Sequence, residues 1–339
     1  MASSPALAPL IGRLISALPV LSMNIVVITP ARPSSRSGNW TTAQRWARIL
    51  RRLGHKVWLA NAYDGDPADL MVALHAWRSA PAIAAFRTKF PDRPLVVGLA
   101  GTDVNTFLVR DAETTLRSLE AADRLVALQD LAGQRLPARL RAKVCVIHQS
   151  AKPLRRRAAG SRRHFEIAVV AHLRAVKDPL RAAKAARLLP ATSRVRILHL
   201  GGADAPQWAA RAAAEMRANP RYVWRGDVPH TEVRRLLGRA RALVLSSVSE
   251  GGANVISEAL AAGIPVLASR IDGSVGLLGK TYPGYFPAGD TAALARLIDR
   301  IETDPGFLAK LRRAAAGRAA LFRPDREEAA WRRLIRELC

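Results

Sequence analysis

The segment from residue 246 to residue 269 contains two glutamates placed where they could bind hydroxyl groups. Glu250 precedes a Gly-rich turn that follows a strand pattern, and Glu258 lies on the helix expected after the turn. Glu258 is the only charged residue between Glu250 and Arg270, and its neighbours are apolar. A buried carboxylate needs hydrogen-bond partners, and sugar or ribose hydroxyls would supply them. The alternative is that Glu258 faces solvent.

The turn after Glu250 predicts an anion site. Gly251 and Gly252 allow the backbone to come close to a ligand, because glycine carries no Cβ. The amides of Gly252, Ala253 and Asn254 would lie at the N-terminus of the helix. Unpaired N–H groups and the helix dipole favour negative charge at that position. The alternative is that the glycines merely form a turn.

A second set of polar residues lies in the first half of the chain, where a Gly-containing turn leads into a helix. Backbone amides and hydroxyls of this turn could converge on an anion; its members are Gly38, Asn39, Trp40, Thr41 and Thr42. Arginine forks match phosphate-like oxyanions well. Four arginines lie nearby in sequence or close to an adjacent strand end: Arg32, Arg36, Arg45 and Arg78. In so basic a chain, a solvated basic face is the alternative.

Strand ends in the same half also carry polar side chains. His75 ends one strand, Thr102 and Asp103 follow another, and Gln149 and Ser150 end the last one. Parallel α/β sheets bind ligands at the carboxyl ends of their strands, so we expect these residues to contact an acceptor. His75 could instead be a structural histidine, and Asp103 could cap the segment that follows it.

The elements that must position these residues alternate between strands and helices in two series. Strands are expected at 24–29, 56–60, 70–74, 95–99, 124–128 and 143–147, and then at 165–170, 195–200, 221–224, 242–245 and 264–268. This alternation predicts an α/β fold with two Rossmann-like, doubly wound domains of mainly parallel strands. The carboxyl edges of the two sheets would face each other across a cleft.

The chain therefore divides into five parts. Residues 1–22 resemble a signal peptide superficially, but prolines and an arginine interrupt the apolar stretch, so we expect a disordered or loosely docked leader. Residues 23–151 form the N-terminal domain, 152–164 a basic linker and 165–322 the C-terminal domain. Residues 323–339 form an amphipathic helix that packs back across the junction.

The composition limits the classes of partner. The 339 residues include 53 Lys plus Arg against 27 Asp plus Glu, a net charge of +26, which favours an anionic substrate. Only eight of the 53 are Lys, so compositional drift is an equal explanation of the charge. Aromatic residues make up 5%, which argues against a nucleic-acid-binding protein, kept as a remote alternative.

Metal, membrane and redox signals are weak in this chain. The seven histidines are scattered without ligand spacing, so no metal site is expected. No apolar run reaches the roughly 18–20 residues of a membrane span. The two cysteines suit a reducing cytoplasm, where we place the protein. The oligomeric state is open.

The segment of residues 246–269 resembles the donor-site motif of retaining family 4 glycosyltransferases, through EGGAN, EAL and AAGIPVLAS. The resemblance implies the GT-B fold, with the nucleotide sugar held in the C-terminal domain and the acceptor in the N-terminal one. It implies that Glu258 holds the ribose and Glu250 the hydroxyls of the donor sugar. The amides from Gly251 to Asn254 would face the diphosphate and the sugar.

A second match is VVAHLRAVKDPLRAAKAARLL, residues 169–189. The family pattern places an Arg and, five residues later, a Lys on the diphosphate. Lys177 fits the Lys position, His172 stands where the Arg is expected, and Arg174 is close enough to substitute. Such cations would stabilise the leaving group without a metal or other cofactor. The alternatives are solvated surface side chains for Lys177 and Arg174 and a structural role for His172.

The N-terminal half is similar to one narrow group of this superfamily, the selenosugar synthases of selenoneine biosynthesis. The likeness is carried by TPARPSSRSGNWTTAQRWARIL, ALHAWRSA, GTDVN, ADRLVALQ and AKVCVIHQS, and it covers residues 23–338. It implies transfer of a sugar from UDP-N-acetylglucosamine or UDP-glucose to selenophosphate, with formation of a carbon–selenium bond. The alternative enzyme is a retaining glycosyltransferase acting on a hydroxyl acceptor, with Asp103 or His75 as base.

Overall fold

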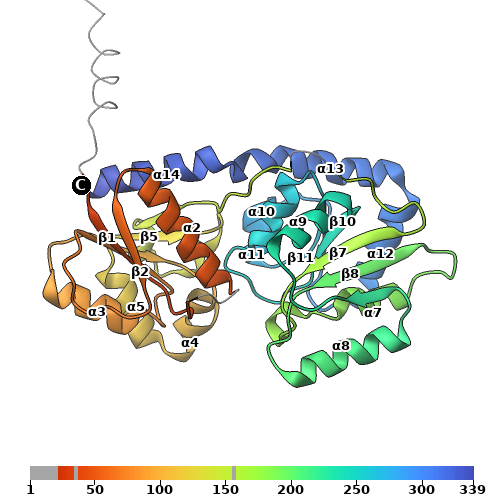
Figure 1. Cartoon of the computed structure of the whole chain (residues 1–339), viewed down its shortest axis with the longest axis horizontal. Coiled ribbons are helices and arrows are strands. Elements are labelled where there is room, and N and C mark those ends of the chain that lie inside the picture. Colours follow the sequence, from red (N-terminus) through yellow and green to blue (C-terminus); the bar gives the residue numbers. More distant parts are fainter. Residues whose placement is uncertain (1–21, 34–36, 155–157) are drawn as a thin grey trace, which may run out of the picture.

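The computed structural model describes residues 22–33, 37–154 and 158–339. The leader expected at residues 1–22 therefore lies outside the described residues except for Ser22, as do residues 155–157 of the expected linker. The described chain forms two α/β units side by side, and the last two long helices run along the same side of both (Figure 1).

The first unit is built on a six-stranded parallel sheet with the order β2-β1-β3-β4-β5-β6. Its strands are β1 (Asn24–Ile28), β2 (Lys56–Ala60), β3 (Leu70–Leu74), β4 (Leu95–Gly98), β5 (Arg124–Ala127) and β6 (Val144–Val146). Its helices are α2 (Gly38–Arg52), α3 (Ala80–Lys89), α4 (Leu108–Arg110), α5 (Ala112–Ala121) and α6 (Ala138–Arg141), with shorter turns at η1 (Asp103–Phe107) and η2 (Ala132–Arg135). Strands such as β3 are buried throughout, because helices cover both faces of a parallel sheet.

The second unit repeats this plan with a parallel sheet of the order β12-β11-β10-β7-β8-β9. Its strands are β7 (Phe165–Val170), β8 (Val195–Leu200), β9 (Tyr222–Trp224), β10 (Ala242–Leu245), β11 (Val266–Ser269) and β12 (Tyr285–Phe286). Its helices are η3 (Ala175–Lys177), α7 (Arg181–Arg187), α8 (Pro206–Ala218), α9 (His230–Arg239), α10 (Asn254–Ala261), α11 (Asp272–Leu278), α12 (Thr291–Thr303), α13 (Pro305–Ala319) and η4 (Ala320–Phe322). The fold class expected from the sequence, two doubly wound domains, is confirmed.

The last helix, α14 (Pro324–Leu338), returns from the second unit to the first (Figure 1). Its apolar side enters the core on one face of the first sheet, where Trp331 packs edge-on against Trp46 of α2 with ring centroids 5.0 Å apart. Pro324 opens the helix, as proline at the first helical position commonly does. The two units are thus joined twice, by the chain near residue 151 and by the start of α14.

The strands differ from the sequence expectation mainly at their ends. The strand expected at 264–268 is β11 at Val266–Ser269, and the two-residue strand β12 was not expected. Two residues are too short to produce an apolar periodicity. Among the described residues, no helix has both the length and the apolar character needed to cross a membrane.

Candidate functional site

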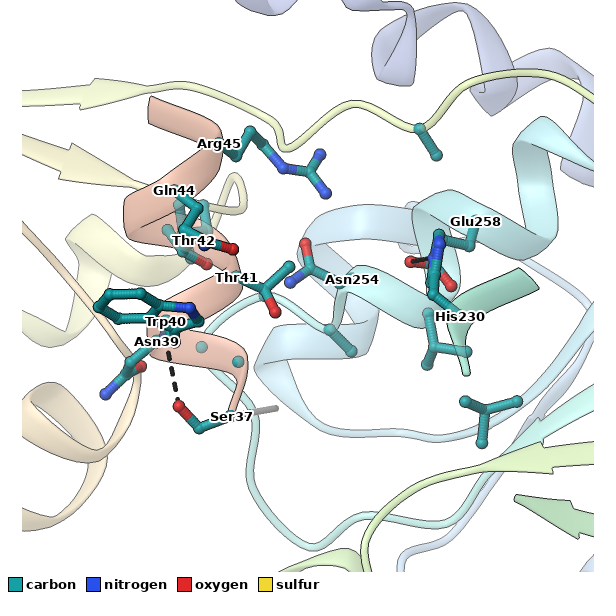
Figure 2. A pocket seen from close by; sticks show the side chains of 18 of the residues that line it. Ser37, Asn39, Trp40, Thr41, Thr42, Gln44, Arg45, His230, Asn254 and Glu258 are labelled. Carbon is teal, nitrogen blue, oxygen red and sulfur yellow. Dashed lines mark hydrogen bonds and ion pairs between the residues drawn. The ribbon is translucent and has the colours of Figure 1, made fainter. Parts of the chain in front are cut away.

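A cleft of about 1820 Å³ separates the carboxyl edges of the two sheets. The first unit lines it with the loop after β1, with α2 and with the ends of β3 and β4; the second unit lines it with the loops after β7, β8, β9 and β10. Figure 2 shows the N-terminal part of α2 on one side and α10 with Glu258 on the other. Such edges are where doubly wound sheets bind ligands.

Glu250 and Lys177 form an ion pair on the second-unit side of the cleft. The Lys177 Nζ lies 2.6 Å from Glu250 Oε1, and the two side chains are 16% and 9% exposed. The hydroxyl of Ser247 donates to the same carboxylate oxygen at 2.5 Å. Lys177 reaches this position because it ends the short turn η3 just after β7, next to β10 in the sheet. The pair places one cation and one carboxylate together in the cleft wall.

The glycines after Glu250 meet the first unit. A Cβ on Gly251 would lie 2.5 Å from the backbone nitrogen of Gly101, and one on Gly252 would lie 2.5 Å from the Cβ of Leu128. The Asn105 side-chain amide donates to the hydroxyl of Ser249 at 2.9 Å across the same seam. The sequence suggested that these two glycines allow a ligand to come close to the backbone. In the structure, they allow the two units to pack closely against each other.

The helix α10 begins at Asn254, with Ala253 as its N-cap residue. The cap side chain makes no hydrogen bond to the first turn, so the helix N-terminus is not closed by a capping hydroxyl or carboxylate. Gly251, Gly252, Ala253 and Asn254 all line the cleft. Among the described residues, the buried Oδ1 of Asn254 has no hydrogen-bond partner. The first turn of α10 therefore lies at the cleft without a side-chain cap.

Glu258 lies one turn further along α10 and also lines the cleft (Figure 2). Its Oε1 is 3.2 Å from the Nε2 of His230, the first residue of α9, and the Glu258 side chain is 14% exposed. The hydrogen bond to Glu258 raises the pKa of His230, an effect opposed by burial and by the charges of Arg234 and Arg45. The sequence analysis did not single out His230; its only signal was its place just after β9, at a strand end.

The remaining cations of the second unit sit on the loop after β7. His172 and Arg174 line the cleft with Lys177. The Arg174 side chain is 48% exposed and its guanidinium lies 4.0 Å from Asp204, so this cation is more solvated than Lys177. Of these three residues, Lys177 is held in the cleft by a short ion pair, the one with Glu250.

On the first-unit side, the N-terminus of α2 faces the cleft. The residues from Ser37 to Thr42 line it, and Ser37 caps the helix by accepting a hydrogen bond from the Trp40 amide at 3.3 Å. Arg32, Arg45 and Arg78 line the cleft as well, whereas Arg36 lies outside the described residues. The guanidinium of Arg45 donates to the carbonyl oxygen of Ser150 and lies 3.6 Å from Glu327 of α14.

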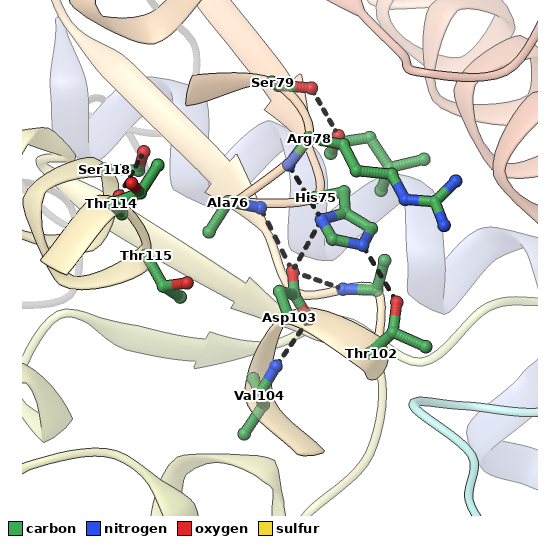
Figure 3. Close-up of polar contacts among 12 residues, drawn as sticks. His75, Ala76, Arg78, Ser79, Thr102, Asp103, Val104, Thr114, Thr115 and Ser118 are labelled. Carbon is green, nitrogen blue, oxygen red and sulfur yellow. Dashed lines mark hydrogen bonds and ion pairs between the residues drawn. The ribbon is translucent and has the colours of Figure 1, made fainter. Parts of the chain in front are cut away.

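Three residues expected to contact an acceptor lie behind the cleft wall. His75 and Asp103 are 1% and 0% exposed, and neither lines the cleft. Asp103 accepts hydrogen bonds from the amides of Ala76 and Ala100 at 3.1 and 3.0 Å, so its carboxylate is used to hold two strand ends (Figure 3). Gln149 is also buried, and its amide donates to the Thr42 hydroxyl at 2.7 Å.

His75 nevertheless acts on the cleft through Thr102. Its Nδ1 accepts a hydrogen bond from the Arg78 amide at 3.2 Å, so in the neutral ring Nε2 carries the proton and donates to the Thr102 hydroxyl at 2.8 Å (Figure 3). Burial lowers the pKa of His75, partly offset by Asp103, which favours the neutral ring. Thr102 lines the cleft, and a hydroxyl that accepts a hydrogen bond from His75 can still donate one to another group. The backbone of His75 is in the left-handed region, with a φ of 78°.

Residues 153–318 match the family model "Glycosyl transferases group 1". The chain is 37% identical over 115 residues to the 2-deoxystreptamine glucosyltransferase of Streptomyces kanamyceticus, covering 32% of this chain and 29% of that protein. It is 30% identical over 122 residues to the D-inositol 3-phosphate glycosyltransferase of Frankia alni, covering 36% and 30%. The matches thus span less than a third of the length of these relatives.

Solved structures match nearly the whole chain. Anabaena HepE in complex with UDP and glucose superposes with a TM-score of 0.70 at 15% identity, covering 93% of this chain and 100% of that one. Sucrose-phosphate synthase from Thermosynechococcus elongatus superposes with a TM-score of 0.71 at 18% identity, covering 93% and 98%. At such identities the likeness concerns the fold, which is the two-domain arrangement called GT-B.

Proposed function

Starting from a second domain that matches the group 1 glycosyltransferases and from the GT-B fold, we propose that the chain transfers a sugar from a UDP-sugar to selenophosphate, with retention at the anomeric carbon. The observation that carries the donor half is the grouping of Lys177, Glu250 and Glu258 around the open N-terminus of α10. The acceptor half rests on the first-domain wall of the cleft and on the resemblance of the N-terminal half to selenosugar synthases.

The donor is held by the second domain. The carboxylate of Glu258 accepts hydrogen bonds from the ribose hydroxyls, and Glu250 accepts them from hydroxyls of the sugar. The diphosphate lies against the amides from Gly251 to Asn254, which the helix dipole makes favourable for negative charge. Support comes from the burial of both carboxylates in the cleft wall. HepE, which shares the fold, has been solved in complex with UDP and with UDP-glucose.

The leaving group is stabilised by cations. As the bond from the anomeric carbon to the diphosphate breaks, negative charge grows on the departing UDP. Lys177 meets this charge, and the more solvated Arg174 adds to it. Fixed positive charge in a partly desolvated site is worth more than in water and needs no reorganisation during the reaction. Because these groups supply the charge, the proposed reaction requires no metal ion.

The acceptor wall suits a small oxyanion. The first-domain wall offers hydroxyl and guanidinium groups to the cleft, from Ser37, Thr41, Arg45, Arg78 and Thr102. Selenophosphate is such an anion, and its selenium is already a good nucleophile. Selenium attacks the anomeric carbon on the face that UDP leaves, so a C–Se bond forms as the C–O bond breaks. Water then cleaves the Se–P bond, which yields the selenosugar and phosphate.

A hydroxyl acceptor is the second candidate. The two relatives named above are, by their names, glycosyltransferases of 2-deoxystreptamine and of inositol phosphate, which are polyhydroxyl compounds. A hydroxyl needs a base within reach. His75 and Asp103, expected in that role from the sequence, are buried behind the cleft wall. This placement favours the acceptor that needs no base from the protein.

The experiment measures UDP released from UDP-N-acetylglucosamine and from UDP-glucose, with selenophosphate, with inorganic phosphate or with no acceptor, and records product masses. Selenophosphate-dependent UDP release with a selenium-bearing sugar supports the proposal. Release with a panel of polyols but not with selenophosphate would leave the donor half standing and refute the acceptor half. Binding of no UDP-sugar by calorimetry would refute both halves.

A further inference from the structure

His230 lies in the cleft and contacts Glu258, but the proposed reaction gives it no role. It is the first residue of α9, and its Nε2 lies 3.2 Å from Oε1 of Glu258 on α10 (Figure 2). The imidazole is 64% exposed, so it reaches solvent on one side while it holds the carboxylate on the other. The two residues are 28 positions apart, and the contact joins the first residue of α9 to the middle of α10.

The hydrogen bond from His230 fixes one of the two oxygens of the Glu258 carboxylate. A carboxylate offers about four lone-pair positions. His230 takes one of them and thereby restrains the rotation of a glutamate side chain that has several freely rotating bonds. The positions that remain are then presented in one orientation. Because ordering a rotamer-rich side chain on binding costs conformational entropy, a carboxylate ordered in advance binds hydroxyls more tightly.

Charged groups on three helices act on the pKa of His230. Glu258 faces it from α10, Arg45 from α2, and Arg234 follows on the next turn of its own helix. The hydrogen bond to Glu258 raises the pKa of His230, and the two arginines and burial oppose that rise. A protonated ring here is a cation in the cleft that would also hold the two charges of a diphosphate. Binding such an anion favours the protonated ring further.

We infer that His230 is a positioning residue of the donor site, which orders Glu258 for the ribose and whose proton strengthens binding of the nucleotide sugar. The inference rests on the proposed donor. The inference predicts the sign of the pH dependence. A group whose pKa rises when the ligand binds contributes affinity at low pH. That affinity is lost as the pH rises through the pKa of His230 in the complex.

The test is calorimetric titration with UDP-glucose from pH 5.5 to 8.5. UDP-glucose is used because its phosphates are diesters, whereas the terminal phosphate of UDP titrates in this range, as other phosphate monoesters do near pH 6. For the unchanged protein we expect the Kd to rise about two- to fivefold across the range, the size of an exposed ion pair. His230→Gln keeps a donor for Glu258 but cannot titrate, so its Kd should stay flat.

Three further variants separate positioning from a structural role. His230→Ala should bind UDP-glucose more weakly than His230→Gln at every pH and raise the KM for the donor with kcat little changed. His172→Gln removes the other cleft histidine and should leave the pH slope in place. His164→Gln, on the loop before β7 and not among the cleft residues, is the matched control and should behave as the unchanged protein.

Two results overturn the inference while the proposed function stands: UDP-glucose binding whose pH slope persists in His230→Gln, or a variant effect confined to kcat. Absence of UDP-glucose binding by the unchanged protein at every pH would instead refute the proposed function, and the inference with it.

Discussion

Replacing Lys177 by methionine tests the assignment of the leaving-group site. Methionine keeps most of the length and the apolar stem of lysine and removes only the ammonium group. In the structure that group lies 2.6 Å from Glu250 Oε1, with the two side chains 16% and 9% exposed. A charge so shielded from water acts on a neighbouring charge with an energy of about 4 kcal/mol at 4 Å and an effective dielectric constant near 20.

The expected loss follows from that energy. If Lys177 meets the charge that grows on departing UDP, its removal should lower kcat about 10²- to 10³-fold, the usual cost of one fixed donor at a developing oxyanion. The KM for the donor should change much less. Arg174→Ala should lower kcat no more than about tenfold, because the Arg174 side chain is 48% exposed and exposed charges are screened.

The assay is initial-rate UDP release at saturating UDP-sugar and acceptor, with Lys184→Ala as the matched control. Lys184 is an exposed lysine of α7 outside the cleft, so its variant should retain full activity. Folding of Lys177→Met is checked by its melting temperature and by UDP-glucose binding, since removal of Lys177 leaves the Glu250 carboxylate without its cation. A folded, donor-binding Lys177→Met protein with kcat within threefold of the unchanged protein would refute the reasoning.

Further predictions concern the donor site, the seam between the domains and the cation requirement. Glu258→Ala should weaken UDP-glucose binding about ten- to a hundredfold, the value of one or two hydrogen bonds to a charged group, with a smaller change in kcat measured at saturation. Gly251→Ala places a Cβ 2.5 Å from the Gly101 nitrogen, so it should separate the domains, seen as a larger radius of gyration by small-angle scattering, while Gly317→Ala, where a Cβ meets nothing within 4 Å, should not. Incubation with EDTA should leave UDP release unchanged; a rate restored only by added Mg²⁺ or Mn²⁺ would refute the metal-free mechanism.

The fold could be predicted because its signals are local. Strands buried on both faces need continuous apolar runs, and Leu70–Leu74 is one such run. The final helix could be placed to within a residue because Pro324 marks its start and its apolar face recurs with helical spacing. The strand β12 could not be predicted, because Tyr285–Phe286 is recognisable as a strand only by its pairing with β11.

The proposed donor side of the site is easier to predict from the sequence than the proposed acceptor side. Glu250, the glycines and Glu258 share one loop and one helix, so a single segment carries their spacing. His230 belongs to a different loop, and only the packing of α9 beside α10 brings it to Glu258. His75 lies at the expected strand end, but it has a φ of 78° and its ring is buried against Thr102. A left-handed backbone at a residue other than glycine is uncommon and cannot be read from residue type.

The two glycines of the turn after Glu250 lie where the two domains meet. Gly251 and Gly252 belong to the turn that lines the cleft. The space that a Cβ would take at each of them is occupied by Gly101 and Leu128 of the first domain. Gly101 directly precedes Thr102, a cleft residue whose hydroxyl contacts the His75 ring. A change in the position of one domain therefore displaces the amides of the turn and the Thr102 hydroxyl relative to each other. Because both halves of the proposed reaction meet at this seam, the geometry of transfer depends on the contact between two backbones, which tolerates no side chain on either side.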